Sequence, residues 1–73
     1  MIHTAEILFQ TQIPNNRYLS LCLMKYGEKQ FSTEWYDETT DTFYNPKYYT
    51  DLLLCYRDFQ RILKKELNTY NQK

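Results

Sequence analysis

The stretch that decides the fold is Asn45 to Leu67, NPKYYTDLLLCYRDFQRILKKEL. At 100° per residue most of its apolar side chains fall on one side of a helix, opposite most of its charged side chains. The apolar side consists of Tyr48, Tyr49, Leu52, Cys55, Tyr56, Phe59, Ile62, Leu63 and Leu67. Asn45 suits the N-cap, and Pro46 suits the first helical position, where its missing N–H costs nothing. The stretch therefore predicts one long amphipathic helix with a basic last turn.

Three strand candidates precede this helix, each bounded by residues that favour turns. They cover Ala5 to Ile13, Arg17 to Tyr26 and Gln30 to Asp37, with turns at Pro14-Asn15-Asn16 and at Gly27-Glu28. A candidate for a short fourth strand covers Thr42 to Tyr44. Strands joined by short turns pair as antiparallel hairpins, and one helix then lies across one face. The expected fold class is α+β: a small antiparallel sheet of three strands, or four with the short candidate, and one long C-terminal helix (β-β-β-α).

The length of the turns decides which side chains the helix covers, because a shift of one residue reverses the two faces of a strand. Two three-residue turns place Ile7, Phe9, Leu19, Leu21, Leu23, Phe31 and Trp35 on one face. Two two-residue turns instead place Ile7 and Phe9 with Cys22, Met24, Phe31 and Trp35. We favour the first arrangement, since it leaves the second face more polar. That face still keeps Leu8, Met24 and tyrosines, so we expect a partner to cover it.

The 73 residues predict a single domain over 1–73, with 1–4 and 68–73 frayed. A chain of this length buries only about 60% of its unfolded surface. Its two cysteines, Cys22 and Cys55, lie in apolar stretches, so we expect reduced, buried thiols in a reducing cytosol. The N-terminus lacks the pattern of a secretory signal, and no apolar run approaches the ~18 residues of a membrane helix. We therefore expect a cytoplasmic protein with no membrane contact.

Few residues are suited to catalysis or to metal binding. His3 is the single histidine and lies in a segment expected to be mobile. The sequence has no glycine-rich phosphate loop and no paired Cys or His at metal-ligand spacing. Asp37 and Asp41 resemble the start of a calcium loop only faintly, because the glycine at the sixth position is missing. We expect no enzyme, no cofactor and no metal.

Single-stranded nucleic acid is the alternative partner. Aromatic side chains beside positive charge hold single strands on open sheets. The sheet candidates are Arg17, Lys25, Lys29, Tyr18, Tyr26 and Trp35, and the helix adds Arg57, Arg61, Lys64 and Lys65. Nine bases are balanced by nine acids, however, so the chain lacks the net positive charge that supplies most non-specific affinity. Nucleic acid is therefore not favoured.

Protein binding is the leading hypothesis, because charge and aromatic side chains are unevenly distributed. Residues 34–51 carry five acids against Lys47 alone, and the chain has eight tyrosines, which suit binding surfaces. Leu54 falls among charged helix residues, which suggests a contact in a homodimer or in another complex. The candidate partner-binding residues are Leu54, Arg57, Arg61, Tyr18, Tyr26, Tyr36, Glu34, Asp37, Glu38 and Asp41. Size and composition suggest a phage or mobile-element accessory protein that inhibits a host defence factor.

Overall fold

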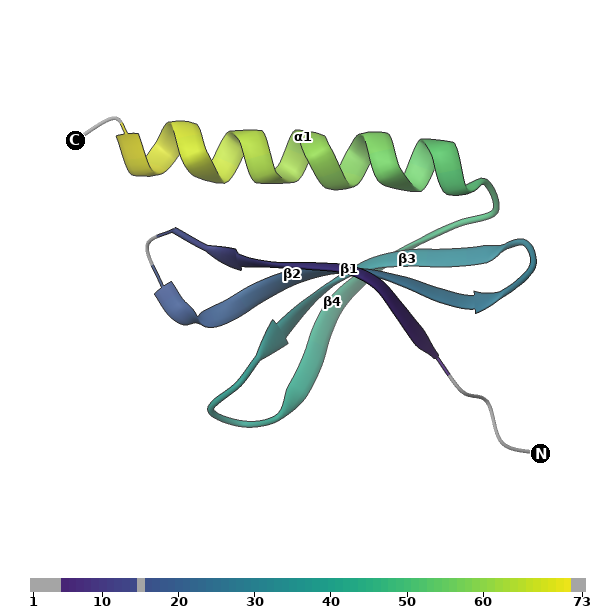
Figure 1. Cartoon of the computed structure of the whole chain (residues 1–73), viewed down its shortest axis with the longest axis horizontal. Coiled ribbons are helices and arrows are strands. Elements are labelled where there is room, and N and C mark those ends of the chain that lie inside the picture. The colour runs from purple at the N-terminus through teal and green to yellow at the C-terminus, as the bar shows by residue number, and fades with distance from the viewer. Residues whose placement is uncertain (1–4, 15, 72–73) are drawn as a thin grey trace.

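The computed structural model describes residues 5–14 and 16–71, with the side chains up to residue 68. It is an α+β fold in which a four-stranded antiparallel sheet is followed by one helix (Figure 1). The elements are β1 (Glu6–Ile13), β2 (Asn16–Gly27), β3 (Gln30–Asp37), β4 (Thr42–Tyr49) and α1 (Leu52–Asn71). The strands lie in the order β1-β2-β3-β4, so β1 and β4 are the two edges. The predicted fold class is confirmed.

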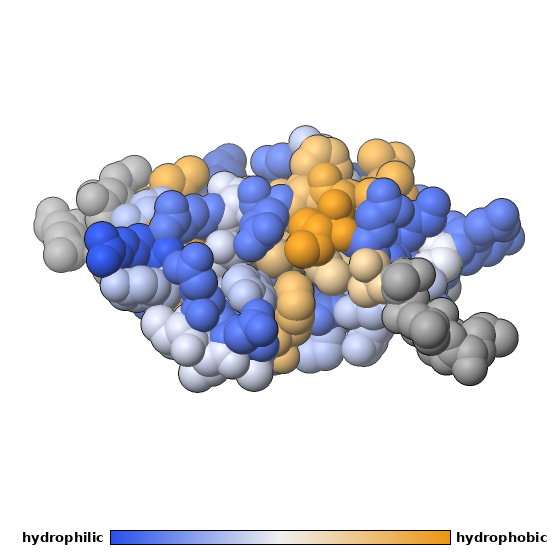
Figure 2. Space-filling model, turned by 60° about the horizontal axis from the view of Figure 1, so that its bottom comes forward, coloured by the Kyte–Doolittle hydropathy of each residue, from blue (hydrophilic) through white to orange (hydrophobic). Residues whose placement is uncertain are grey.

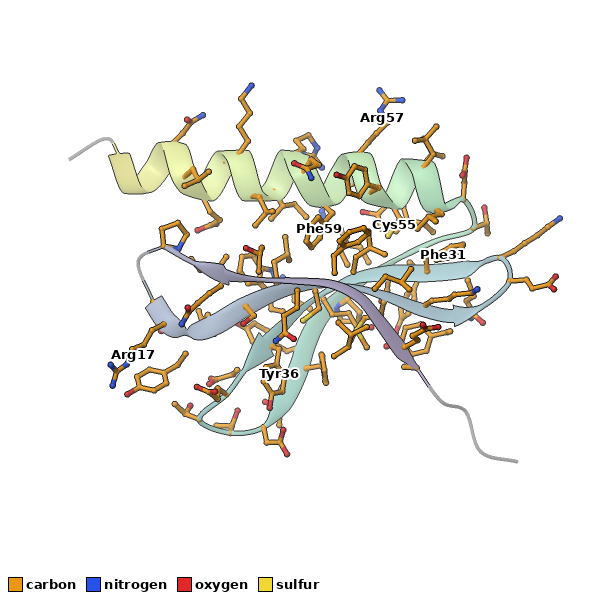
Figure 3. The ribbon with its side chains drawn as sticks, viewed as in Figure 1. Arg17, Phe31, Tyr36, Cys55, Arg57 and Phe59 are labelled. Carbon is orange, nitrogen blue, oxygen red and sulfur yellow. The ribbon has the colours of Figure 1, made fainter. Side chains whose placement is uncertain are left out.

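The helix lies along one face of a strongly twisted sheet, and the hairpin of β3 and β4 curls away from it (Figure 1). Cys55 and Phe59 point from the helix towards the sheet, whereas Arg57 points away from it (Figure 3). Within the described part of the chain, the helix is not apolar enough to cross a membrane.

The helix begins six residues later than its sequence pattern predicts. Asp51 is the N-cap: its Oδ1 accepts a hydrogen bond from the backbone N–H of Leu53 (3.0 Å), and its carbonyl accepts one from Cys55 (3.1 Å). A carboxylate at this position satisfies a free N–H and suits the positive end of the helix. Asn45 as the N-cap was therefore a wrong prediction.

Asn45 and Pro46 instead form a bulge in β4. Pairing passes from Thr33↔Lys47 directly to Trp35↔Tyr44, so β4 carries one extra residue there. Asn45 has a φ of 56°, which asparagine tolerates better than most residues, and proline is accepted at a bulge or an edge. The fourth strand thus runs from Thr42 to Tyr49 and includes the two tyrosines assigned to the helix.

The C-terminal end of the helix also differs from the prediction. The helix continues to Asn71, and its last turn contains no basic residue. Lys64 and Lys65 lie more than a turn before the end. Residues 1–4 and 72–73, which were expected to fray, fall outside the described residues.

The core lies between the helix and one sheet face, as the favoured register predicts. It consists of Ile13, Leu21, Leu23, Phe31, Cys55 and Phe59, flanked by Leu8, Leu19, Trp35, Tyr49, Ile62 and Leu63. The turn between β2 and β3 has two residues rather than three, but a bulge at Tyr26 adds the missing one. The same side chains of β2 and β3 therefore share a face as would do so with a three-residue turn.

Ile7 is the exception to this register. A bulge at Leu8 separates Ile7↔Met24 from Phe9↔Leu23, so Ile7 and Phe9 lie on opposite faces. Leu8 packs against the core instead of lying on the second face. The prediction that Ile7 belongs to the covered face was wrong, because a bulge shifts parity within one strand.

Candidate functional site

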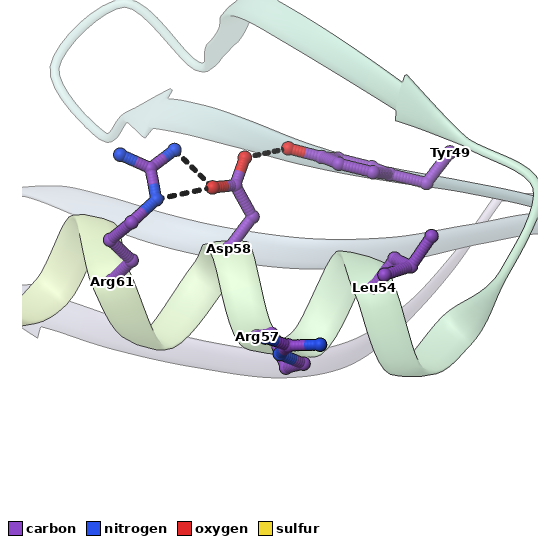
Figure 4. Close-up of a pocket in the computed structure, with 5 residues that line it drawn as sticks. All are labelled: Tyr49, Leu54, Arg57, Asp58 and Arg61. Carbon is purple, nitrogen blue, oxygen red and sulfur yellow. Dashed lines mark hydrogen bonds and ion pairs between the residues drawn. The ribbon is translucent and has the colours of Figure 1, made fainter.

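The ten candidate residues lie in three separate places. Leu54, Arg57 and Arg61 line a shallow hollow of about 460 Å³ on the helix, together with Tyr49 and Asp58. We call these five residues the charged hollow (Figure 4). It lies on the side of the helix nearest β4, since Tyr49 is a β4 residue.

Asp58 connects Tyr49 and Arg61 in the charged hollow. Its carboxylate accepts hydrogen bonds from the Tyr49 hydroxyl and from Arg61 Nε (2.7 Å), and it also forms an ion pair with the Arg61 guanidinium (Figure 4). The Tyr49 hydrogen bond, followed by Arg61, lowers the pKa of Asp58. Burial and the bond to Asp58 raise the pKa of Tyr49 to about 12. The charge of Arg61 is thus already matched within the chain, and Leu54 lies beside it, 52% exposed.

Glu34 is buried rather than part of an acidic surface. It is 5% exposed, and its carboxylate accepts hydrogen bonds from the hydroxyls of Tyr26 and Ser32 (2.6 Å for Ser32). Burial and the bond to Glu34 raise the pKa of Tyr26 to about 12. A buried carboxylate needs such donors. The structure therefore removes Glu34, and the hydroxyl of Tyr26 with it, from the candidate contact surface.

On the sheet face opposite the helix, aromatic side chains of the chain itself cover part of the apolar surface. Cys22 and Met24 are buried there although they do not belong to the core cluster. Above this face the rings of Tyr26 and Tyr48 lie 6.2 Å apart, and those of Tyr36 and Phe43 lie 4.8 Å apart. Cys22 and Met24 are thus covered within the chain, whereas Ile7 (45% exposed), Phe43 (42%) and Tyr48 (63%) keep apolar and aromatic surface on this face. Leu54 lies on the helix side of the sheet, so a single partner contact does not cover both Leu54 and the opposite sheet face.

Five of the ten candidates gather at the turn between β3 and β4. The Glu38 N–H donates to the Tyr18 carbonyl (2.8 Å), which brings the start of β2 to this turn. Tyr36 donates its hydroxyl to Asp41 (2.5 Å) and packs on Phe43. We call this group the acidic end: Tyr18, Tyr36, Asp37, Glu38, Asp41 and Phe43. Figure 3 shows Tyr36 on the side of the sheet away from the helix.

Asp37 stabilises the turn itself. Its Oδ1 accepts the backbone N–H (2.9 Å) and the hydroxyl (2.6 Å) of Thr39. These bonds, the hydroxyl first, lower the pKa of Asp37 and favour its charged form. Asp41 adopts a φ of 53° in the same turn. The acidic end is therefore an ordered hairpin tip with exposed carboxylates and aromatic rings.

Sequence reasoning missed an apolar patch on the other side of the helix. Phe9, Leu52, Leu53 and Tyr56 line a hollow of about 500 Å³, and we call these four residues the apolar patch. The rings of Phe9 and Tyr56 are 5.5 Å apart, and Leu53 is 63% exposed. Hydrophobic surface is not confined to this patch, since Figure 2, turned so that the bottom of Figure 1 comes forward, shows more of it near the middle of the molecule. The signal was present in the sequence: three consecutive leucines in a helix point in directions 100° apart, so one face does not bury all three.

The residues expected to bind nucleic acid do not form one platform. Trp35 packs against the core under the helix, whereas Tyr26 bonds to Glu34 on the opposite face. Arg17 lies over the ring of Tyr18, 5.0 Å from its centroid, at the far end of the sheet. Trp35 and Tyr26 thus lie on opposite faces of the sheet, and Arg17 with Tyr18 forms a separate pair at one end.

The described residues contain no cluster of side chains typical of metal binding. Within 5–14 and 16–71, no group of three or more His, Cys, Asp or Glu is placed to hold a metal ion. Both cysteines are free and buried, and burial, the largest cause, raises the pKa of each thiol to about 11. His3 lies outside the described residues. Comparisons of the chain with protein-family models, curated proteins and solved structures gave no match.

Proposed function

We propose that this protein is a non-enzymatic protein-binding module and that the acidic end contacts its partner. The observation that carries this proposal is the clustering of carboxylates and aromatic rings on one ordered hairpin tip. Tyrosine and phenylalanine supply contact area at low entropic cost, and charges select the partner and its orientation.

The chemistry of the acidic end indicates the kind of partner. Asp37, Glu38 and Asp41 outnumber Arg17, whose guanidinium lies over the Tyr18 ring. A partner surface with exposed lysine or arginine side chains around an apolar groove would complement this tip. Inhibition of a host defence factor by a phage or mobile-element protein is the setting that we propose, on the basis of size and composition.

We also propose that the protein is a homodimer. The apolar patch supports this proposal, since an exposed cluster of large apolar side chains is typical of an interface. It replaces Leu54 and the second sheet face as the surface expected to mediate association.

The acidic end is tested with two variants that remove the same number of charges. Glu38→Gln/Asp41→Asn removes two charges from the tip, and asparagine tolerates the φ of 53° at position 41. Glu6→Gln/Glu28→Gln is the matched control away from the tip. After the partner has been identified by affinity capture, titration calorimetry should show a Kd about tenfold higher for the first variant only.

Equal affinities for the two variants would contradict the role of the acidic end. A salt dependence that is lost only in the tip variant would support it, because screening acts on the charges that make the contact.

A further inference from the structure

We propose that a second copy of this chain pairs with β1 along its open edge, antiparallel, about a two-fold axis beside Gln10 or Thr11. The proposal rests on the homodimer proposed above and names the strand at which the two copies meet. The two sheets then join into one continuous sheet, with both helices over the same face.

The edge of β1 is regular where the axis passes. From Phe9 to Gln12, each residue of β1 pairs in sequence with a residue of β2, without a bulge. These residues include no charge, no proline and no glycine. The backbone N–H and C=O groups on the outer side of such a strand form a ready template for another strand.

The opposite edge is closed to the same pairing. β4 contains the bulge at Asn45, the proline at 46, which has no N–H to donate, and the charge of Lys47. Each of these features hinders strand addition. β1 has one such feature, the bulge at Leu8, which lies outside the regular stretch from Phe9 to Gln12. Among the described strands, β1 is therefore the edge that can accept another β1, and β1-to-β4 addition is disfavoured. Such pairing closes as a dimer and does not extend into a filament.

The side chains of β1 are compatible with their own two-fold copies. Glu6 is the single charged residue of β1, and antiparallel pairing places it towards the far end of the partner strand. Phe9, 49% exposed, faces Ile13 of the second copy if the axis passes at Thr11, and Thr11 of the second copy if it passes at Gln10. Both arrangements place the two apolar patches on the same side of the joined sheet, facing each other across the axis.

The molecule has enough surface for this contact. The face with β1 in front is the broad one, 46 by 28 Å (Figure 1). A stable interface buries about 800 Å² per partner, which occupies only part of that face.

The first experiment measures association with a matched pair of variants. Gln10→Lys/Gln12→Lys places like charges opposite each other in both arrangements. Thr42→Lys/Tyr44→Lys makes the same change, at the same spacing, on β4. By analytical ultracentrifugation the wild type should be a dimer at micromolar concentration, the β1 variant should raise the dimer Kd at least about tenfold, and the β4 variant should leave it within about twofold. Circular dichroism checks that both variants are folded.

The second experiment locates the axis. Only a residue that faces its own copy comes within the ~4.4–6.8 Å between Cα atoms that a disulfide requires. Under mild oxidation, either Gln10→Cys or Thr11→Cys should form a cross-linked dimer, whereas Tyr44→Cys should not.

The outcomes separate the two proposals. A wild type that stays monomeric at high micromolar concentration overturns both the homodimer and the β1 contact. A dimer that is unaffected by the β1 lysines and forms no cross-link at position 10 or 11 overturns only the β1 contact. In that case, weaker association of Leu54→Lys would assign the dimer to the charged hollow.

Discussion

The two long sides of the helix contact the sheet through different kinds of interaction. Towards β1, the apolar patch makes ring contacts such as Phe9 with Tyr56. Towards β4, the Tyr49 hydroxyl donates a hydrogen bond to Asp58 on the helix, and Arg61 bonds to the same carboxylate from within the helix. On the polar side Tyr49, Asp58 and Arg61 bond to one another within the chain, whereas the apolar side keeps exposed surface that gains from contact with another protein.

The two sheet edges differ as well. β1 has a bulge at Leu8 but is regular and uncharged from Phe9 to Gln12, whereas β4 is interrupted by Asn45 and Pro46 next to Lys47. The β4 side, where Tyr49 bonds to Asp58, is thus also the side at which strand addition is hindered. We infer that β1 and the apolar patch form the associating side of the molecule.

Phe59→Ala should have the largest effect, because Phe59 lies in the core that both sides share. Removing a buried phenylalanine typically costs about 3–5 kcal/mol, and a domain of this size has on the order of 5 kcal/mol in total. The variant should lose the dispersed amide signals of its NMR spectrum. Gln60→Ala, at an exposed neighbouring position, is the control, and a well-dispersed spectrum for Phe59→Ala would contradict the core assignment.

Asn45→Val tests the bulge that closes the β4 edge. A β-branched residue at a φ of 56° should lower the free energy of unfolding by about 1–2 kcal/mol, whereas Asn45→Gly should change it by a few tenths. Urea denaturation measures both. If valine were tolerated as well as glycine, the backbone at position 45 would not require the left-handed conformation.

Asp51→Ala tests the start of the helix, where the two sides of the molecule meet. Loss of the side-chain bond to the Leu53 N–H should cost about 1 kcal/mol and reduce the helical circular dichroism of a marginally stable variant. Asn45→Gly, which retains the bulge, should leave the helical signal unchanged. A larger loss of helix signal at position 45 than at position 51 would restore the earlier start predicted from sequence.

Asp58→Asn tests the polar side and should have the smallest effect. Because folding lowers the pKa of Asp58, its charge stabilises the fold above the unfolded pKa of about 3.9, and this contribution disappears as pH falls through the folded value. The variant should be less stable than the wild type at pH 7 by about 0.5 kcal/mol, and the difference should vanish in acid. A difference that is independent of pH would show that the bond to Tyr49, rather than the charge, carries the effect.

Much of the fold was predictable because its signals are local. The bounds of β3, the buried cysteines and the central place of Phe59 follow from alternation and helical periodicity. The helix start was not predictable in this way, since Asn45-Pro46 suits both a helix N-terminus and a strand bulge. Pairing of β4 with β3 decides between them.

The sites were predicted less well, because a surface joins residues from distant parts of the chain. The sequence identified the carboxylates and tyrosines of the acidic end, but also included Glu34, whose burial depends on Tyr26 and Ser32. Leu54 was selected by its angle on the helix, whereas the more exposed Leu53 was overlooked.

The sequence by itself determined the class of fold, the amphipathic helix and the acidic character of the third turn, since composition and periodicity are properties of neighbouring residues. The tertiary structure alone decided the register after each bulge, the closed and open edges, and the meeting of Phe9 with Tyr56. One extra residue in a strand reverses the faces of everything beyond it. Which residue is extra depends on the partner strand, and for that reason local pattern does not decide it.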